Sequence, residues 1–155
     1  MGRAMLAGKH IQALVLAFCI VPAMLLAAPA SGYPGLEEAR QTAYEMADQF
    51  IKQGWNVRNE FQRGHLGKGE STTITATLYQ GNAYAFIASG GPREVFDVDL
   101  LLFDENNNLV DQDRENENVA VVTVTPRWTG TFHIKIVMED SAAEGAHYCL
   151  VTGYR

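Results

Sequence analysis

The side chains best suited to chemistry in this 155-residue chain are four carboxylates. Asp97 and Asp99 alternate with apolar residues in one run, and Asp111 and Asp113 lie in the next. If the two runs pair as neighbouring strands, their four carboxylates offer the hard oxygen ligands that Ca²⁺ prefers, and without a cation they would repel one another. The four acids are therefore candidate calcium ligands, but carboxylates that alternate with core residues more often form a solvated polar face, which is the favoured interpretation.

A second pattern imitates a calcium-binding loop. Asp104, Asn106, Asn108 and Glu115 occupy positions one, three, five and twelve of the EF-hand spacing. That loop requires glycine at its sixth position and helices on either side, whereas this chain has Leu109 there and patterns typical of strands around it. We predict a polar hairpin turn here instead of a metal site.

Catalytic motifs are missing from the sequence. It contains no H-E-x-x-H, no G-x-S-x-G and no Cys-His pattern. His65 is expected in a turn, His133 on an exposed strand face and His147 at the start of a strand, so none is expected to partner another. We predict that the protein is not an enzyme.

Aromatic residues near arginines form the remaining candidate binding surface in the sequence. Trp128, Tyr79 and Phe96 are expected at strand ends or loops, close to Arg127 and Arg93. Such pairs commonly form recognition sites and, if exposed, would suit a polypeptide or a carbohydrate. The competing interpretation is that these rings cap the ends of the apolar core.

The first 30 residues have the features of an export signal. Arg3 and Lys9 precede an apolar block from Ala13 to Ala28, and an A-x-A triplet ends at Ala30. We expect cleavage after Ala30 and a periplasmic or extracellular product. An uncleaved anchor is the alternative, but the block is shorter than the roughly 20 residues of a spanning helix and contains Pro22.

Size and charge limit the remaining 125 residues to one domain with few classes of partner. Cleavage removes two basic residues and no acidic one, so 10 basic residues face 18 acidic residues and the formal charge changes from −6 to −8. Nucleic acid and anionic membranes are poor partners for such a charge. Cys149 is left alone and is interpreted as a small buried hydrophobe, the alternative being a thiol that pairs two chains.

A helix is expected before the strands. Residues 31–54 contain a short leader followed by apolar residues at helical spacing from Leu36 to Gln53, with Glu37 in the first turn and Gly54 after the last. A lone helix of this length is marginal in water, so we expect it to pack on the rest of the chain.

Residues 55–155 alternate between apolar and polar side chains and predict a mainly β domain. Gly64, Gly67 and Gly69 are interpreted as a turn-rich link. Seven or eight short strands with this spacing are typical of an antiparallel β-sandwich or jelly roll. The expected strands are 55–61, 72–78, 84–88, 96–103, a strand from 109, 119–125, 131–138 and 148–152.

Parts of the strand pattern resemble a known family. The runs that carry the resemblance are Leu78–Phe86, Asp97–Asp104, Val124–Pro126 and Thr129–Phe132. They are similar to the bacterial pre-peptidase C-terminal domain, over roughly residues 64–154. The resemblance implies an extracellular β-sandwich of a kind usually appended to secreted proteases, with related modules that bind calcium or collagen. It implies a stand-alone version here, extended by a helix.

Two functional hypotheses follow. The first is an exported, non-catalytic binding or accessory module for a polypeptide or carbohydrate, with Ca²⁺ as a stabilising ion. The second is a structural or assembly protein that docks on a partner chain through its N-terminal helix.

Overall fold

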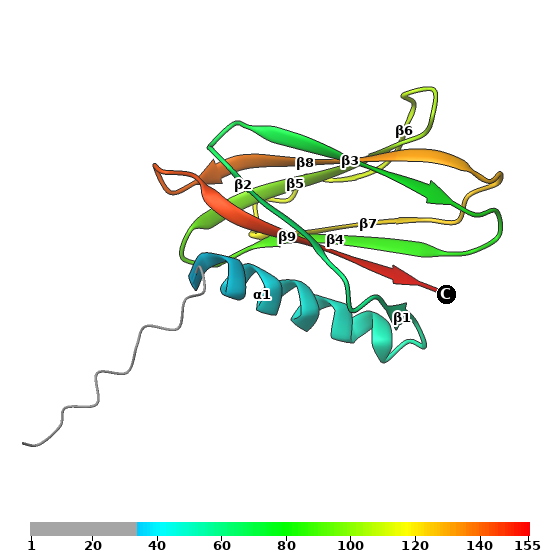
Figure 1. Cartoon of the computed structure of the whole chain (residues 1–155), viewed down its shortest axis with the longest axis horizontal. Helices are drawn as coiled ribbons and strands as arrows, with labels where there is room; N and C mark the ends of the chain where they lie inside the picture. Colours follow the sequence, from blue (N-terminus) through cyan, green and yellow to red (C-terminus); the bar gives the residue numbers. More distant parts are fainter. Residues whose placement is uncertain (1–33) are drawn as a thin grey trace, which may run out of the picture. The chain divides into compact units, whose positions relative to one another are not determined.

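The structure is a computed structural model that describes residues 34–155 (Figure 1). The predicted export segment lies outside the described residues. Within them, no helix has the length and apolar character needed to cross a membrane.

The first element is helix α1, Pro34–Ile51. Ala39, Ala43 and Ala47 recur every four residues on one face and are fully buried. Because alanine has the smallest apolar side chain, this face approaches a sheet closely. The hydroxyl of Ser89 donates a buried 2.6 Å hydrogen bond to the carbonyl oxygen of Ala39, which ties the helix to strand β4. The chain leaves the helix at Gly54, whose φ of 84° suits glycine.

The rest of the described chain forms antiparallel strands arranged in two sheets. One sheet, which we call the helix-side sheet, has the order β1-β9-β4-β7, with β2 also paired to β9; the other, the outer sheet, has the order β3-β8-β5-β6. The strands are β1 (Asn56–Val57), β2 (Gln62–Leu66), β3 (Ser71–Leu78), β4 (Tyr84–Gly90), β5 (Val95–Phe103), β6 (Leu109–Asp113), β7 (Val119–Val124), β8 (Gly130–Ser141) and β9 (Ala146–Tyr154). The predicted β-sandwich with one N-terminal helix is confirmed.

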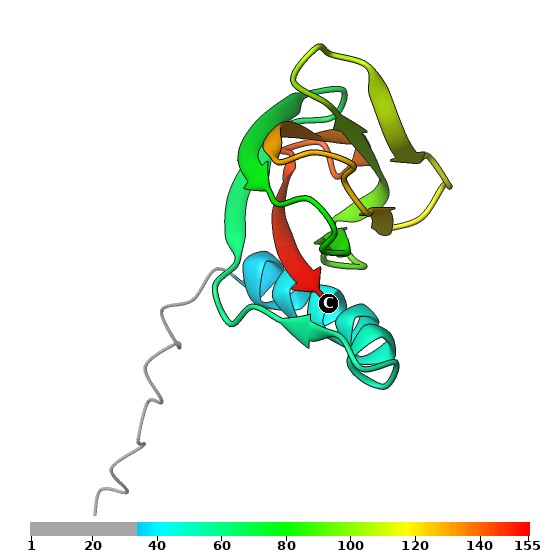
Figure 2. The same cartoon turned by 90° about the vertical axis from the view of Figure 1, so that its right-hand side faces the viewer.

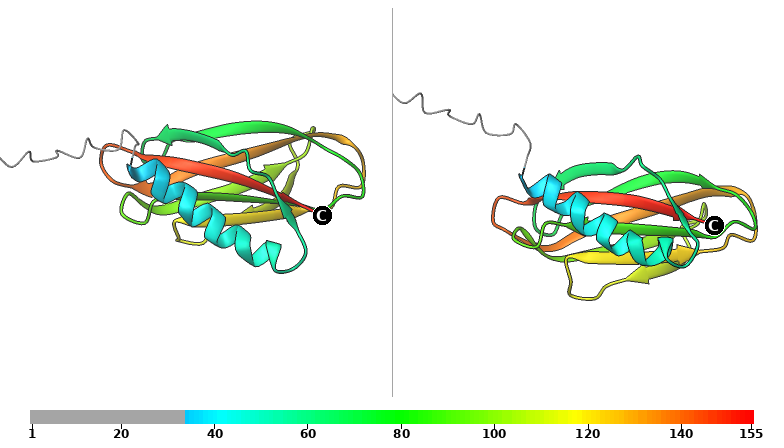
Figure 3. Two further views of the ribbon diagram at one scale, coloured as in Figure 1. Left: turned by 60° about the horizontal axis from the view of Figure 1, so that its bottom comes forward. Right: turned by 90° about the horizontal axis from the view of Figure 1, so that it is seen from below.

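The elements form three layers, as Figure 2 shows. A large apolar cluster fills the space between the two sheets and includes Phe86, Phe132 and Ile136. A second cluster lies between α1 and the other face of the helix-side sheet, where Ile87 and Val151 meet the alanine face. Strand β4 is consequently buried along its whole length. The helix lies over β9 and β4 (Figure 3), and it belongs to the same compact unit as the sheets.

The expected turn around Gly64 is wrong. This glycine lies inside β2 and pairs with Tyr148 of β9. A Cβ atom at Gly64 would come within 2.6 Å of the Tyr148 ring, so glycine is needed for the close approach of a ring and not for a turn. The expected strand over 55–61 is correspondingly replaced by the two-residue β1 and an irregular link, residues 58–61.

Candidate functional site

One open side of the sandwich is closed by carboxylates. We call it the sealed edge: it consists of β6, the last strand of the outer sheet, and β7, the last strand of the helix-side sheet. Asp111 accepts a 2.8 Å hydrogen bond from the backbone N–H of Thr123, and Asp113 accepts one of 2.8 Å from the N–H of Val121. These carboxylates take the place of a neighbouring strand, so backbone donors of β7 are already satisfied.

The other two predicted calcium ligands lie on β5, where they meet further acids. Burial raises the pKa of Asp97, and Glu139 and Asp140 add to that rise. Burial likewise raises the pKa of Asp99, helped by Glu139 and Asp97 and opposed by Arg114. The Arg114 Nε lies 3.9 Å from Asp99 Oδ2, which is too far for a hydrogen bond. One oxygen of Asp97, Oδ1, is buried with no hydrogen-bond partner in the described part of the chain.

The structure does not assemble the predicted calcium ligands into a site. Within residues 34–155, no group of three or more Asp, Glu, His or Cys side chains is placed to hold a metal ion. Asp111 and Asp113 also accept bonds from the backbone N–H groups of Gln112 and Glu115, so both oxygens of each carboxylate have donors. These two acids are therefore engaged in holding the sealed edge.

The loop that imitates an EF-hand is a self-contained hairpin turn between β5 and β6. Asp104 Oδ1 accepts from the backbone N–H groups of Asn106 and Asn108, each at 2.8 Å, and Oδ2 accepts from the Asn108 side chain at 2.9 Å. These bonds, led by the Asn108 side chain, lower the pKa of Asp104. Asn107 adopts a left-handed backbone with φ of 62°.

The opposite side of the sandwich has no such closure, and we call it the open edge. Strand β3 pairs with β8 alone, and no other strand of residues 34–155 covers its second side. Facing it, β9 is covered by β1 and β2, with the 58–61 link between them. Figure 1 shows β2 and β3 diverging from the turn that joins them.

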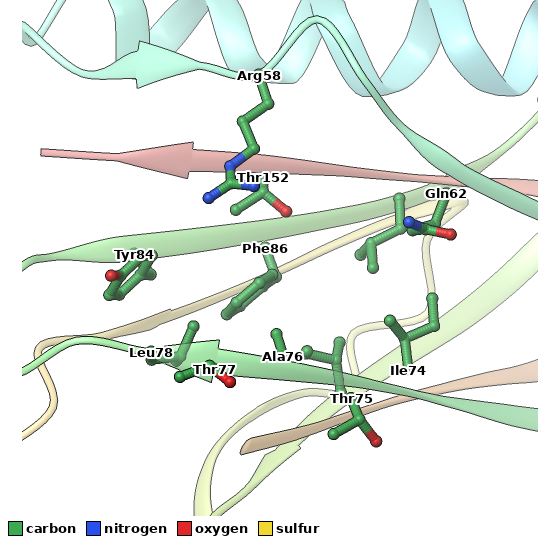
Figure 4. A pocket seen from close by; sticks show the side chains of 12 residues that line it. Arg58, Gln62, Ile74, Thr75, Ala76, Thr77, Leu78, Tyr84, Phe86 and Thr152 are labelled. Atoms are coloured by element: carbon green, nitrogen blue, oxygen red, sulfur yellow. The ribbon is translucent and has the colours of Figure 1, made fainter. Parts of the chain in front are cut away.

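A cavity of about 290 Å³, which we call the groove, lies between β3 and the 58–61 link (Figure 4). Ile74 and Ala76 of β3 line one wall, and Phe86 and Leu150 of the helix-side sheet line the other. These residues belong to the core cluster or pack against it, so the groove leads from solvent to the apolar interior.

Arg58 stands at the rim of the groove on a fixed backbone. Its N–H donates a 3.0 Å hydrogen bond to the carbonyl of Thr152, and its carbonyl oxygen accepts a 3.1 Å hydrogen bond from the Tyr44 hydroxyl. The exposed guanidinium lies 5.9 Å from the centre of the Tyr154 ring and forms no ion pair with any carboxylate of the described chain. Figure 4 shows it reaching from the link toward Thr152.

Three of the five predicted surface residues gather at one end of the sandwich. The Gly81 N–H donates to the carbonyl of Pro126 at 3.1 Å, which places Tyr79 in a loop beside the one that carries Arg127 and Trp128. Tyr79 is 58% exposed and Trp128 is 38% exposed. We call these three residues the Trp128 surface.

Trp128 caps the core and is also partly exposed. One face of its ring stacks on the buried Phe132, with 5.8 Å between the ring centres, so it caps the core. The exposed part, together with Arg127 and Val110, lines a hollow of about 270 Å³.

The other two predicted surface residues lie at the opposite end. Phe96 is half exposed beside Pro92 and the 116–118 loop, and Arg93 forms an ion pair with Glu38 of α1. The two ends are separated by the length of β4, which pairs with Val124 at one end and with Val119 at the other. Phe96 and Arg93 therefore form no common surface with Trp128.

The expectation that no histidine partners another is wrong. His65 of β2 pairs with His147 of β9, and their rings meet edge to face with centres 5.0 Å apart. The sequence hides this contact, because the glycines around His65 are typical of a turn. On the outer sheet, the Thr75 hydroxyl lies 3.3 Å from His133 Nδ1. Asp104 interacts electrostatically with His133, but its carboxylate accepts hydrogen bonds from its own loop. Thr75, His133 and Asp104 therefore do not form a catalytic triad.

Cys149 has the properties of an inert core residue. It is fully buried between α1 and the helix-side sheet, and burial raises the pKa of its thiol to about 12. A thiol of that pKa is scarcely ionised at neutral pH and is a poor nucleophile.

The fold and the two edges define an antiparallel β-sandwich with one helix packed on it. No protein-family model and no curated protein matches the chain, so the resemblance to the pre-peptidase C-terminal domain stays a prediction. Among solved structures, the chain is similar to PliG of Aeromonas hydrophila, a periplasmic inhibitor of g-type lysozyme, at 11% identity and a TM-score of 0.44. The similarity covers 66% of this chain and 87% of PliG.

Proposed function

We propose that this protein is an exported, non-catalytic module that binds an extended segment of another polypeptide at its open edge. The observation that carries the proposal is the unpaired side of β3, which borders a groove leading to the apolar core. A strand added to β3 would gain backbone hydrogen bonds and place alternate side chains in the groove.

The composition of β3 supports this proposal. Its eight residues, Ser71–Leu78, include no charged residue and no proline, and their register with β8 is unbroken. Charges, prolines and bulges are the usual features that protect an edge strand from pairing. A strand that lacks all of them is suited to accept a partner.

The Trp128 surface favours a second candidate, the binding of a carbohydrate. An exposed indole beside an arginine and a hollow offers stacking and hydrogen bonds to a sugar ring. Titration with soluble oligosaccharides, followed by tryptophan fluorescence of the wild type and of Trp128→Ala, tests this candidate.

The alternative of assembly through the helix gains no support. The apolar face of α1 already packs on β4 and β9, and its other side is polar. Docking of a partner on the apolar face would require the helix to leave the sheet.

Selection from a library of random extended peptides, displayed on phage, tests the proposed function. A selected peptide, synthesised and titrated into the isotope-labelled protein, is expected to shift the amide resonances of β3 and of the 58–61 link. Ala76→Phe fills the groove and is expected to weaken binding, whereas Trp128→Ala, the control at the other surface, is not. Peptides that shift only the Trp128 surface, or the failure of every selection, would overturn the proposal.

A further inference from the structure

The groove presents one cation, Arg58, on a backbone that two hydrogen bonds hold in place. Arg58 is held on both sides, by the bond of its N–H to Thr152 and by the bond of the Tyr44 hydroxyl to its carbonyl. Its guanidinium has no carboxylate partner in the described chain, although acidic residues outnumber basic ones by 18 to 12 overall. An arginine at the rim of an apolar groove is suited to bind a carboxylate brought by a ligand.

We propose that the segment bound at β3 is acidic, with a glutamate or aspartate that meets Arg58. This inference rests on the proposed function and names the chemistry of its partner. Side chains two positions apart lie on the same face of a strand. The segment should therefore carry a carboxylate and, two residues away, an apolar side chain that enters the groove beside Ala76 and Phe86.

Charge complementarity distinguishes this partner from the two occupants that the chain itself could provide. A second copy pairing β3 with β3 would bring Ser71–Leu78, which contains no acidic residue. The segment of residues 1–33 contains no aspartate or glutamate either. Neither of these paired segments contains a carboxylate of its own for Arg58, so charge complementarity favours a different polypeptide.

A series of three matched peptides tests the proposal. Each has about nine residues of alternating valine and threonine, with glutamate, glutamine or lysine at the central inward position. We expect the purified protein to bind the glutamate peptide about fivefold more tightly than the glutamine peptide, as a partly exposed ion pair would give. The lysine peptide should bind more weakly than either.

Substitutions in the protein test whether the charge of Arg58 causes the preference, independently of any effect on folding. Arg58→Gln is expected to abolish the preference for the glutamate peptide over the glutamine peptide, and Arg58→Lys should keep part of the preference. Arg63→Gln, which removes an exposed cation on β2 that does not line the groove, is the matched control and should keep all of it. Melting curves show whether each variant folds.

The outcomes distinguish this inference from the proposed function. Binding at β3 with equal affinity for the glutamate and glutamine peptides would overturn the acidic partner and leave polypeptide binding intact. A preference that survives Arg58→Gln would likewise exclude Arg58 as its source. If no peptide of the series or of the library perturbs β3, the proposed function itself fails. Self-association through β3, seen by light scattering, would identify a second copy as the occupant and would also overturn the inference.

Discussion

The two open sides of this sandwich differ in whether the backbone of their edge strands has hydrogen-bond partners. At the sealed edge, Asp111 and Asp113 of β6 reach across to the N–H groups of β7, so one sheet's side chains satisfy the other sheet's backbone. At the open edge, the outer side of β3 pairs with no strand of the described residues, and a groove lies beside it.

The contrast teaches that acids on one strand can satisfy the backbone donors of a strand in the other sheet. A sandwich with two unprotected sides would be prone to pair with any exposed strand. Asp111 and Asp113 satisfy two backbone donors of β7, so β7 is less available for such pairing than β3. Under the proposed function, β3 is the strand on which an extended segment of the partner pairs.

The largest expected effect comes from breaking the sealed edge. Replacing both Asp111 and Asp113 with alanine should lower the free energy of unfolding by about 2 kcal/mol, because two backbone donors lose charged acceptors. Denaturant unfolding measures this change. The Asp111→Asn/Asp113→Asn variant retains an acceptor oxygen at each position and is expected to lose clearly less. Equal stability of the alanine variant and the wild type would show that the carboxylates do not hold this edge.

A smaller effect of opposite sign is expected at Asp99, near the sealed edge. Its raised pKa means that the folded state holds a proton more tightly than the unfolded state does, so its contribution to stability falls as the pH rises from the ordinary aspartate pKa through the raised value. At pH 7, Asp99→Asn should therefore raise the free energy of unfolding, by less than the double alanine variant at the sealed edge lowers it.

Unfolding measured between pH 3 and pH 7 checks this sign. The wild type and Asp99→Asn should converge in acid and diverge toward neutral pH. A variant that is less stable than the wild type at pH 7 would mean that the Arg114 contact outweighs burial and the neighbouring acids.

The smallest expected effect is at the turn that leads into β6. The pKa of Asp104 is lowered, so its contribution is present above the ordinary aspartate pKa and is lost as the pH falls through the lowered value. Asp104→Ala should reduce the melting temperature at pH 7 less than the double alanine variant at the sealed edge does, and the difference from the wild type should vanish in strong acid. If Asp104→Ala still melts at a lower temperature than the wild type in strong acid, the loss of stability comes from a changed turn conformation and not from the loss of the charged carboxylate.

The alternation of apolar and polar residues was sufficient to predict the strands that carry the core, including β3, β5 and β8. It failed around Gly64, because a glycine under a tyrosine ring and a glycine in a turn look alike in sequence. The helix was predictable because the alanine face and the terminal glycine are local signals.

The candidate site was less predictable, because it depends on which strands end at an edge. The acids Asp111 and Asp113 have the same spacing whether they bind calcium or backbone N–H groups, and only the position of β7 decides between the two. Arg58 gave no signal in the sequence, since its role depends on the separation of β3 from the 58–61 link. The predicted aromatic surface was split because Phe96 and Trp128 lie at opposite ends of the strands.

The most direct test of the account is amide hydrogen exchange of β3 and β7, measured with and without the glutamate-containing valine–threonine peptide. We predict that β7 amides such as Val121 and Thr123 are protected in both states, and that alternate amides of β3 become protected only when the peptide is present. Protection that appears at the Trp128 surface instead, or a β3 that is equally protected without the peptide, would contradict the account.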